Sequence, residues 1–463
     1  MTNQNLEKRA VDLFAVALSR SLGDSRVIVD SDILAQFSRD KSHCEGVMPD
    51  VAVRVKSEDE LTSVLKMANE YNVPVVARGA GTGKAGGAIP LRGGLVLDMT
   101  RLDQLLEVDR ENLLAVVRPG IVTGNLQSMV ENEGLFYPPD PNSLDTCTIG
   151  GNVAHNAGGP RAFKYGVTRE YVMGLRSVLM GGDVVVSGKR TVKGVTGYDV
   201  TALMVGSEGT LGVFSQITLR LTRKPPVLST LLIPMPDEES AGIAVSRIVA
   251  AGIVPRVLEF MDTTIVDVLR TKGVTGIDDG TGALILAEMD GDSEELVERA
   301  TLQLADVCET LGAGEILMAR HGGDREKLWA ARRVMSDAVA ETARHKVSED
   351  IVVPRSLAPQ LLTGLKKISK RFGVKVASYG HAGDGNYHVN VLWDDEGFNV
   401  TPVVAEVFRL TLALGGTITG EHGVGIAKKP YLPWEQGTSL IALQRSIKQV
   451  FDPKGLLNPD KIF

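Results

Sequence analysis

A chain of 463 residues is too long for a single ordinary core, so we expect about two or three domains. Its composition, 43% hydrophobic and 23% charged, is typical of a soluble globular protein, and its net charge of −7 argues against nucleic acid and against a polybasic membrane anchor. No stretch approaches the ~20 apolar residues of a transmembrane helix. The N-terminus lacks the separate basic and apolar regions of a signal peptide, and three isolated cysteines suit a reducing compartment, so we expect a cytoplasmic protein.

The first half of the chain is expected to mix helices with many short strands. Residues 1–48 are predicted to be a helical N-terminal segment, with apolar side chains at helical spacing. A strand, a helix and a second strand follow within residues 51–77, which implies a parallel crossover. Ser57 is the expected N-cap of that helix, and Glu60 is expected to complete a capping box.

The pattern changes at Pro225 and Pro226, where we expect a domain boundary. Two strand–helix–strand units follow, at residues 229–261 and 282–320. This order of elements is that of a ferredoxin-like α+β domain. The last residues, FDPKGLLNPDKIF, are rich in turn formers and are expected to dock against another surface.

A glycine-rich stretch, RGAGTGKAGGAIP at residues 78–90, follows the second strand. A triphosphate-binding loop would need a glycine where Arg78 stands and a hydroxyl where Ala85 stands, so that interpretation fails. Residues 81–86 match GxGxxG, but Pro90 and the flanking glycines leave no room for the helix that a dinucleotide fingerprint requires, which makes it the weaker alternative. We favour a loop whose successive backbone N–H groups bind a pyrophosphate without a helix.

This loop resembles the flavin pyrophosphate loop of the vanillyl-alcohol oxidase and p-cresol methylhydroxylase superfamily. Within that superfamily it is similar to the group that contains the glycolate oxidase flavin subunit, D-lactate dehydrogenase and D-2-hydroxyglutarate dehydrogenase. Residues 137–172 and 193–213 resemble the second and third flavin regions of this group, and the likeness runs from about Pro49 to Phe463.

The resemblance implies an α+β protein in which a two-subdomain FAD-binding domain of the p-cresol methylhydroxylase type is joined to a ferredoxin-like α+β substrate (cap) domain. We expect an FAD-binding domain at residues 1–225 and a substrate domain that carries the metal motif at residues 226–425. A C-terminal segment, residues 426–463, is expected to return to the FAD-binding domain.

The same resemblance implies a set of loop and turn residues that bind the flavin. These residues are Arg78, Gly79, Ala80, Gly81, Thr82, Gly83, Gly86, Pro139, Ser143, Gly150, Gly151, Asn152, Asn156, Gly158, Gly212 and Asn458. Any one glycine taken alone would be interpreted as a tight turn. Relatives that attach flavin covalently use a His or Cys near the loop, and residues 78–90 contain neither, so we expect non-covalent FAD.

Three of the seven histidines lie in two short segments, YGHAGDGNYHVNVLW and TGEHGVG. His381 and His388 flank the turn residues 383–386, so a hairpin would bring them together, and Glu421 comes from a separate glycine-bracketed turn. Two histidines, a carboxylate and an open position are typical of catalytic zinc sites. The spacing alone also fits two ordinary polar residues at a strand end.

Both segments resemble the metal and catalytic motifs of the same group. The resemblance implies that His381, His388 and Glu421 bind a divalent cation, expected to be Zn²⁺. Asn390 would lie nearby, because in a strand it shares a face with His388. His422 would act as the catalytic base, and adjacent residues in an extended turn point in opposite directions, which supports one role each for Glu421 and His422.

The carboxylate of a 2-hydroxy acid needs a cationic side chain. The family's carboxylate-binding arginine stands in a WxxR pattern, and Arg332 follows Trp329 in the same pattern. A guanidinium fork suits a carboxylate, so Arg332 is the expected substrate ligand, with Ser336 and Lys346 as lesser candidates. The alternative is that Arg332 is one of several solvated arginines on a helix.

The sequence therefore predicts an FAD-dependent oxidoreductase that oxidises a small D-2-hydroxy acid, of the D-lactate, glycolate or D-2-hydroxyglutarate class, to the 2-oxo acid. The hydride is expected to pass to flavin N5 and the hydroxyl proton to His422, assisted by the metal. The expected partners are the 2-hydroxy acid and an electron acceptor, which is a quinone, an electron-transfer flavoprotein or a cytochrome; a homodimer is compatible with the sequence. The alternatives are a redox-neutral flavoenzyme like alkyl-glycerone-phosphate synthase and a non-catalytic flavin subunit of a dehydrogenase complex.

Overall fold

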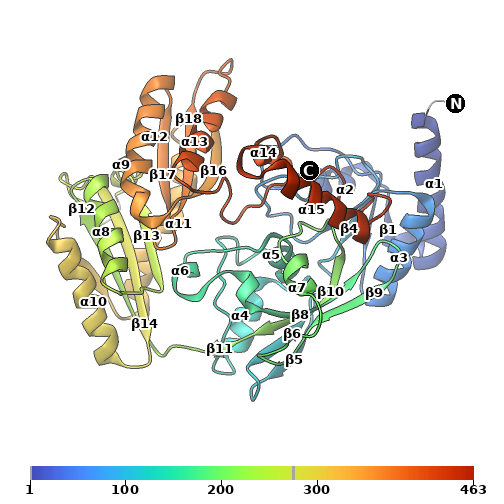
Figure 1. The fold of residues 1–463 in the computed structure, drawn as a ribbon, viewed down its shortest axis with the longest axis horizontal. Coiled ribbons are helices and arrows are strands. Elements are labelled where there is room, and N and C mark those ends of the chain that lie inside the picture. Colours follow the sequence, from blue (N-terminus) through green and yellow to red (C-terminus); the bar gives the residue numbers. More distant parts are fainter. Residues whose placement is uncertain (1–2, 274–276) are drawn as a thin grey trace. The chain divides into compact units, whose positions relative to one another are not determined.

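The computed structural model describes residues 3–273 and 277–463, which form two compact units (Figure 1). Unit 1 comprises Met1–Ala157, Val167–Lys224 and Glu421–Phe463. Unit 2 comprises Gly158–Gly166 and Pro225–Gly420. Among the described helices, none combines the length and the apolar character that crossing a bilayer requires.

The first sheet of unit 1 is a four-stranded sheet around the predicted crossover. Its strands, in spatial order, are β1 (Val27–Ile28), β2 (Val51–Arg54), β4 (Leu95–Asp98) and β3 (Val75–Arg78). β2, β4 and β3 are parallel and β1 is antiparallel. Helix α3 (Glu58–Tyr71) links β2 to β3, which confirms the predicted crossover, and its apolar positions are buried in the core beside the sheet.

The start of α3 differs in one detail from the prediction. Ser57 Oγ accepts the backbone N–H of Glu60 at 3.1 Å, as an N-cap should. The Glu60 carboxylate accepts from the N–H of Lys56 instead of that of Ser57, and it pairs with Arg26. The N-cap prediction is therefore confirmed, whereas the reciprocal half of the capping box is wrong, because Arg26 draws the glutamate away.

The second sheet of unit 1 has five antiparallel strands. In spatial order they are β5 (Leu105–Asp109), β6 (Leu114–Val117), β10 (Val213–Arg220), β8 (Val172–Val178) and β9 (Val184–Gly188). A small ladder joins β7 (Leu135–Phe136) to β11 (Thr222–Arg223). Each of the two larger sheets has its own apolar core, so unit 1 consists of two subdomains, as expected from the resemblance.

The helices of unit 1 are mostly short. They are α1 (Asn3–Leu22), α2 (Ser31–Leu34), α3, α4 (Thr123–Glu131), α5 (Ile149–His155), α7 (Val200–Met204), α14 (Leu432–Glu435) and α15 (Thr438–Phe451). The last residues of the chain return to the first sheet, where Leu457 bridges Val75 in β3 and Asn458 N–H donates to Val75 O at 2.8 Å.

Unit 2 is built on one seven-stranded antiparallel sheet. Its spatial order is β15 (Leu317–Ala319), β12 (Val227–Met235), β14 (Ala283–Gly291), β13 (Val257–Met261), β17 (Lys375–His381), β18 (Asn386–Trp393) and β16 (His345–Val352). The first four strands come from the two predicted strand–helix–strand units and have the ferredoxin-like order. The sequence did not predict that β17, β18 and β16 would continue the same sheet.

Helices cover both faces of this sheet. On one face lie α8 (Glu238–Ala250), α10 (Glu294–Glu309), α12 (Ala358–Phe372) and α13 (Thr401–Ala413), of which α10, α8 and α12 lie side by side (Figure 1). On the other face lie α9 (Thr263–Thr271) and α11 (Gly322–Ala340), whose apolar residues share a core with Leu286, Tyr379 and Leu392 of the strands. A charged group in the middle of a central strand, such as Glu259 of β13 or Glu288 of β14, is therefore enclosed and needs a partner.

The segment Gly158–Gly166, which contains α6 (Ala162–Tyr165), belongs to unit 2 although its neighbours in sequence belong to unit 1. Lys164 Nζ and Tyr165 Oη both donate to the buried Asp290 carboxylate of β14. Phe163 lies against Gly383, where an added Cβ would be 2.7 Å from the ring. These contacts hold the segment to the sheet.

Candidate active site

The glycine-rich loop connects β3 to β4 through residues 79–94, all of which are described and none of which is helical. The GxGxxG match at residues 81–86 therefore lacks the helix that a dinucleotide fingerprint needs, as predicted. Gly81 and Gly86 have φ angles of +69° and +80°, which side chains disfavour. Gly79 lies against the start of α5, where an added Cβ would be 2.2 Å from Thr148 Oγ1. The conformation of the loop therefore depends on glycines, which allow positive φ angles and close backbone approach.

Buried polar atoms beside this loop favour a polar ligand there. Among the described residues of unit 1, Arg78 Nη1, His155 Nε2 and Asn458 Oδ1 are buried without a hydrogen-bond partner. Arg78 begins the loop, His155 Nε2 lies 2.9 Å from where a Cβ of Gly87 would be, and Asn458 Nδ2 donates to Gly87 O at 2.9 Å. Buried groups of this kind normally have partners, so the loop fits a cofactor that supplies them.

Most of the other expected flavin residues lie in the loop or near the start of α5. Ala80, Thr82 and Gly83 lie in the loop, while Pro139, Ser143, Gly150, Gly151 and Asn152 lie in the segment that leads into the first turn of α5. Asn156 ends α5 at a φ of +52°, and a Cβ on Gly212 would be 2.8 Å from the Met204 side chain. Gly158 belongs to unit 2.

The turn that carries Glu421 and His422 is anchored to the glycine loop within unit 1. Ile426 N–H donates to Ala85 O at 2.8 Å, and a Cβ on Gly425 would be 2.1 Å from the same oxygen. The buried Glu208 carboxylate accepts the N–H groups of Val424 and Gly425 at 2.7 and 2.8 Å. The sequence did not single out Glu208.

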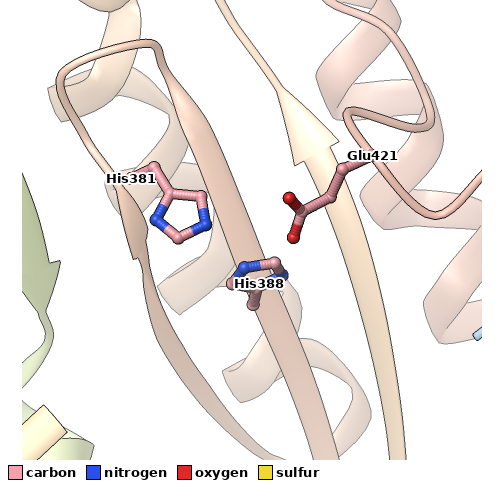
Figure 2. A group of neighbouring side chains, drawn as sticks. All are labelled: His381, His388 and Glu421. Carbon is pink, nitrogen blue, oxygen red and sulfur yellow. The ribbon is translucent and has the colours of Figure 1, made fainter. Parts of the chain in front are cut away.

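The predicted hairpin is present and brings two histidines together. β17 and β18 are antiparallel, His381 lies opposite Asn386, and His388 lies opposite Tyr379. The two imidazole rings are perpendicular, with centroids 5.3 Å apart. Figure 2 shows the Glu421 carboxylate pointing toward both rings, and one donor atom from each of the three residues lies within 4.8 Å of the others. These are the three residues that the resemblance predicted as metal ligands.

Glu421 reaches this position because the chain before it pairs with the edge strand β16. Thr417 bridges Val352, and Gly420 N–H donates to Asp350 Oδ2 at 2.8 Å. A Cβ on Gly420 would be 2.7 Å from Asn386 Nδ2, so a larger residue would require the Asn386 side chain to shift. Asp350, which lies opposite His388 in the sheet, is a further residue that the sequence did not reveal.

A buried carboxylate lies behind His381. Glu259 of β13 is opposite His381 in register, accepts from its Nδ1 and pairs through its other oxygen with Arg332 Nε of α11. Burial would raise the pKa of Glu259, but the neighbouring His381 and Arg332 hold it below its ordinary value. Sequence reasoning missed Glu259, although a lone charged residue in the apolar strand VLEFM was a signal that could have found it.

Arg332 is 4% exposed, so the alternative of a solvated arginine is wrong. Its guanidinium also lies over the Tyr379 ring at 5.1 Å. Asn390 is fully buried, and both of its N–H groups donate to backbone oxygens, of Ala377 and His388. Its Oδ1 has no partner among the described residues.

The remaining predicted residues are less deeply placed. Lys346 is half-buried on β16, and His422 Nε2 is 3.9 Å from Glu421 Oε1. The side chain of Ser336 lies outside the described residues, so its expected role stays a prediction.

Two family models match the chain: the C-terminal domain of FAD linked oxidases over residues 224–462, and the FAD binding domain over residues 49–188. Over 420 residues the chain is 40% identical to the glycolate oxidase subunit GlcD of Bacillus subtilis (strain 168), covering 90% of this chain and 89% of that protein. The chain belongs to the FAD-linked oxidase family. It is an FAD-dependent oxidoreductase, as the sequence predicted.

A second relative supports the family assignment, and a solved structure shows the fold. The D-lactate dehydrogenase of Anaerostipes hadrus is 35% identical over 457 residues, covering 96% of each chain. The structure of p-cresol methylhydroxylase with substrate bound superposes with a TM-score of 0.81 over 99% of this chain and 97% of that one. At 18% identity this likeness shows the fold, and it confirms the expected fold of this FAD-linked oxidase.

Proposed function

We propose that the protein oxidises a small D-2-hydroxy acid to the 2-oxo acid with non-covalent FAD and a divalent cation, expected to be Zn²⁺. The observation that carries this proposal is the His381–His388–Glu421 set, whose donor atoms lie within 4.8 Å of one another. Two imidazoles and one carboxylate leave a coordination position open, as catalytic zinc sites do. The relatives named as a glycolate oxidase subunit and a D-lactate dehydrogenase support a 2-hydroxy acid as the substrate class.

The reaction divides the work between the site residues. Bound FAD would accept the hydride from the carbon that bears the hydroxyl, and the cation would polarise that hydroxyl. His422 acts as the base and takes the hydroxyl proton. Its neighbour Glu421 has the separate role of metal ligand. Arg332 binds the substrate carboxylate, with Lys346 and Ser336 as further candidates, and Asn390 Oδ1 offers an acceptor beside His388.

The products are the 2-oxo acid, one proton and a reduced flavin. The electron pair then passes to a quinone, an electron-transfer flavoprotein or a cytochrome. Flavin reduction by the substrate therefore does not require oxygen. We expect a cytoplasmic enzyme, and a homodimer is compatible with the sequence.

An anaerobic substrate panel tests the proposal. We expect one of D-lactate, glycolate or D-2-hydroxyglutarate to bleach the flavin absorbance, and removal of the metal by a chelator to abolish this until Zn²⁺ is restored. The change His422→Asn should leave FAD and metal content intact and slow flavin reduction about 10²–10⁴-fold, because the base is lost. The proposal is wrong if protein shown to hold both FAD and metal is reduced by none of these acids.

Two other outcomes would identify the alternatives. Group exchange on an acylated glycerone phosphate without net flavin reduction would indicate a redox-neutral enzyme. Flavin that is reduced only when another protein is added would indicate a non-catalytic flavin subunit of a dehydrogenase complex.

A further inference from the structure

We propose that Glu259 is a positioning residue that orients His381 for metal binding, an inference that rests on the proposed metal site. A carboxylate can only accept a hydrogen bond, so the contact between Glu259 Oε1 and His381 Nδ1 requires the proton on Nδ1. Nε2 then carries the lone pair that a cation needs. Glu259 thus selects the tautomer as well as the direction of the ring.

The register of the sheet sets this contact. Glu259 and His381 are directly opposite each other on β13 and β17, and directly opposite side chains on one face lie about 5 Å apart at Cβ. Both side chains are enclosed, with 0% and 3% of their surface exposed. Water has little access to either group, so we expect the two side chains to remain bonded to each other.

Arg332 compensates the charge of Glu259 from helix α11. It pairs with Glu259 Oε2, so one oxygen of the carboxylate serves the arginine and the other serves the histidine. The same guanidinium lies over Tyr379, whose ring is 5.4 Å from that of His388. The arginine expected to bind substrate is therefore also bound to the carboxylate that orients a metal ligand.

The same face of the sheet provides a matched control. Glu288 of β14 is 2% exposed and is also paired with arginines, Arg256 and Arg325. It also accepts from Trp329 Nε1 at 3.2 Å, so the tryptophan and the arginine of the WxxR pattern reach two different buried carboxylates. Within the described part of the chain, no histidine bonds to Glu288, so it shares the burial and ion pairing of Glu259 without contact to the metal set.

The test compares Zn²⁺ affinity of the full-length FAD-loaded protein with that of Glu259→Gln and Glu288→Gln, measured by competition with a chelator. We expect Glu259→Gln to weaken Zn²⁺ binding about 10–100-fold and Glu288→Gln to change it less than about 2-fold. In nitrogen-15 histidine NMR of the zinc-loaded proteins, the Nδ1 proton of His381 should exchange faster with water in Glu259→Gln than in wild type.

Each outcome is decisive. Equal affinity and equal proton exchange in wild type and Glu259→Gln would overturn the inference and leave the proposed function standing. Equal losses in both variants would also overturn it, since burial alone would then explain the effect. A wild-type protein that binds no divalent cation would overturn the proposed metal site itself. If Glu259→Gln does not fold, Glu259→Asp, which keeps the charge but retracts the carboxylate, should show an intermediate loss of affinity.

Discussion

The glycine loop of unit 1 and the histidine hairpin of unit 2 are built in opposite ways. The loop takes its shape from glycines such as Gly81 and Gly86, whose φ angles are positive. In the hairpin, the predicted ligands His381 and His388 are buried side chains on one face of a sheet. A backbone site depends on local conformation, whereas a side-chain site depends on the register of strands far apart in sequence.

Because of this difference, different kinds of substitution should disrupt the two sites. A loop of backbone groups should fail when a side chain is added where no space exists. A set of side chains should fail when the strands that hold it shift, even if every ligand is still present. Three substitutions compare the hairpin, the support of the loop and a position outside both, from the largest expected effect to the smallest.

The largest effect is expected at Gly385, in the turn of the histidine hairpin. Its φ is +82°, and an added Cβ would be 2.1 Å from Val353 O. Gly385→Ala should lower the free energy of unfolding by at least about 2 kcal/mol and weaken Zn²⁺ binding more than about 100-fold, because the turn that joins β17 to β18 must move. Thermal unfolding and chelator competition measure the two effects.

Gly415→Ala is the matched control for Gly385→Ala. Gly415 has a φ of +73°, and nothing lies within 4 Å of the position that an added Cβ would take, so the control carries backbone strain without a close approach. A loss of about 1 kcal/mol with unchanged Zn²⁺ affinity is expected. If both variants bind Zn²⁺ equally well, the hairpin does not control the metal set.

An intermediate effect is expected at Glu208. This carboxylate is a side chain that supports the turn beside the glycine loop. Glu208→Ala removes the acceptor for the N–H groups of Val424 and Gly425. Charge-assisted hydrogen bonds contribute about 1.5–3 kcal/mol each, so we expect the turn to loosen, FAD to bind about 10-fold more weakly and flavin reduction to slow. Flavin fluorescence on dilution measures the affinity.

The exposed Glu107 provides the comparison for Glu208. Its carboxylate pairs with Arg190 at the surface of unit 1, and Glu107→Ala should leave FAD affinity unchanged. An identical FAD affinity in Glu208→Ala and wild type would contradict the role assigned to this carboxylate.

The smallest effect is expected at Ser57, remote from either site in sequence. Ser57→Ala removes the N-cap hydrogen bond to Glu60 N–H and should cost about 1 kcal/mol of stability, with FAD and metal content unchanged. Ser293 stands at the N-cap of α10 but makes no cap hydrogen bond, so Ser293→Ala should cost much less. Equal losses in denaturant unfolding of the two variants would show that the cap bond is not the cause.

Much of the fold could be predicted because the relevant signals are local. Ser57 begins α3 through its own side chain, and the two strand–helix–strand units of unit 2 are visible in the apolar pattern. The turn between His381 and His388 is short enough that its glycines indicated a hairpin. The extension of that hairpin into a seven-stranded sheet was missed, because strand neighbours are chosen by packing and not by adjacent residues.

The amino-acid sequence alone predicted the family, the helix-free glycine loop and the candidate metal ligands. Each of these predictions depends on short motifs that are visible in the sequence. Only the tertiary structure decided that Glu259 lies between His381 and Arg332, that Asp350 holds Gly420, and that Glu208 holds the turn after His422. These partners are distant along the chain, and strand register and burial bring them together. A charged residue in an apolar strand signals that it has a partner, but the sequence does not say which one.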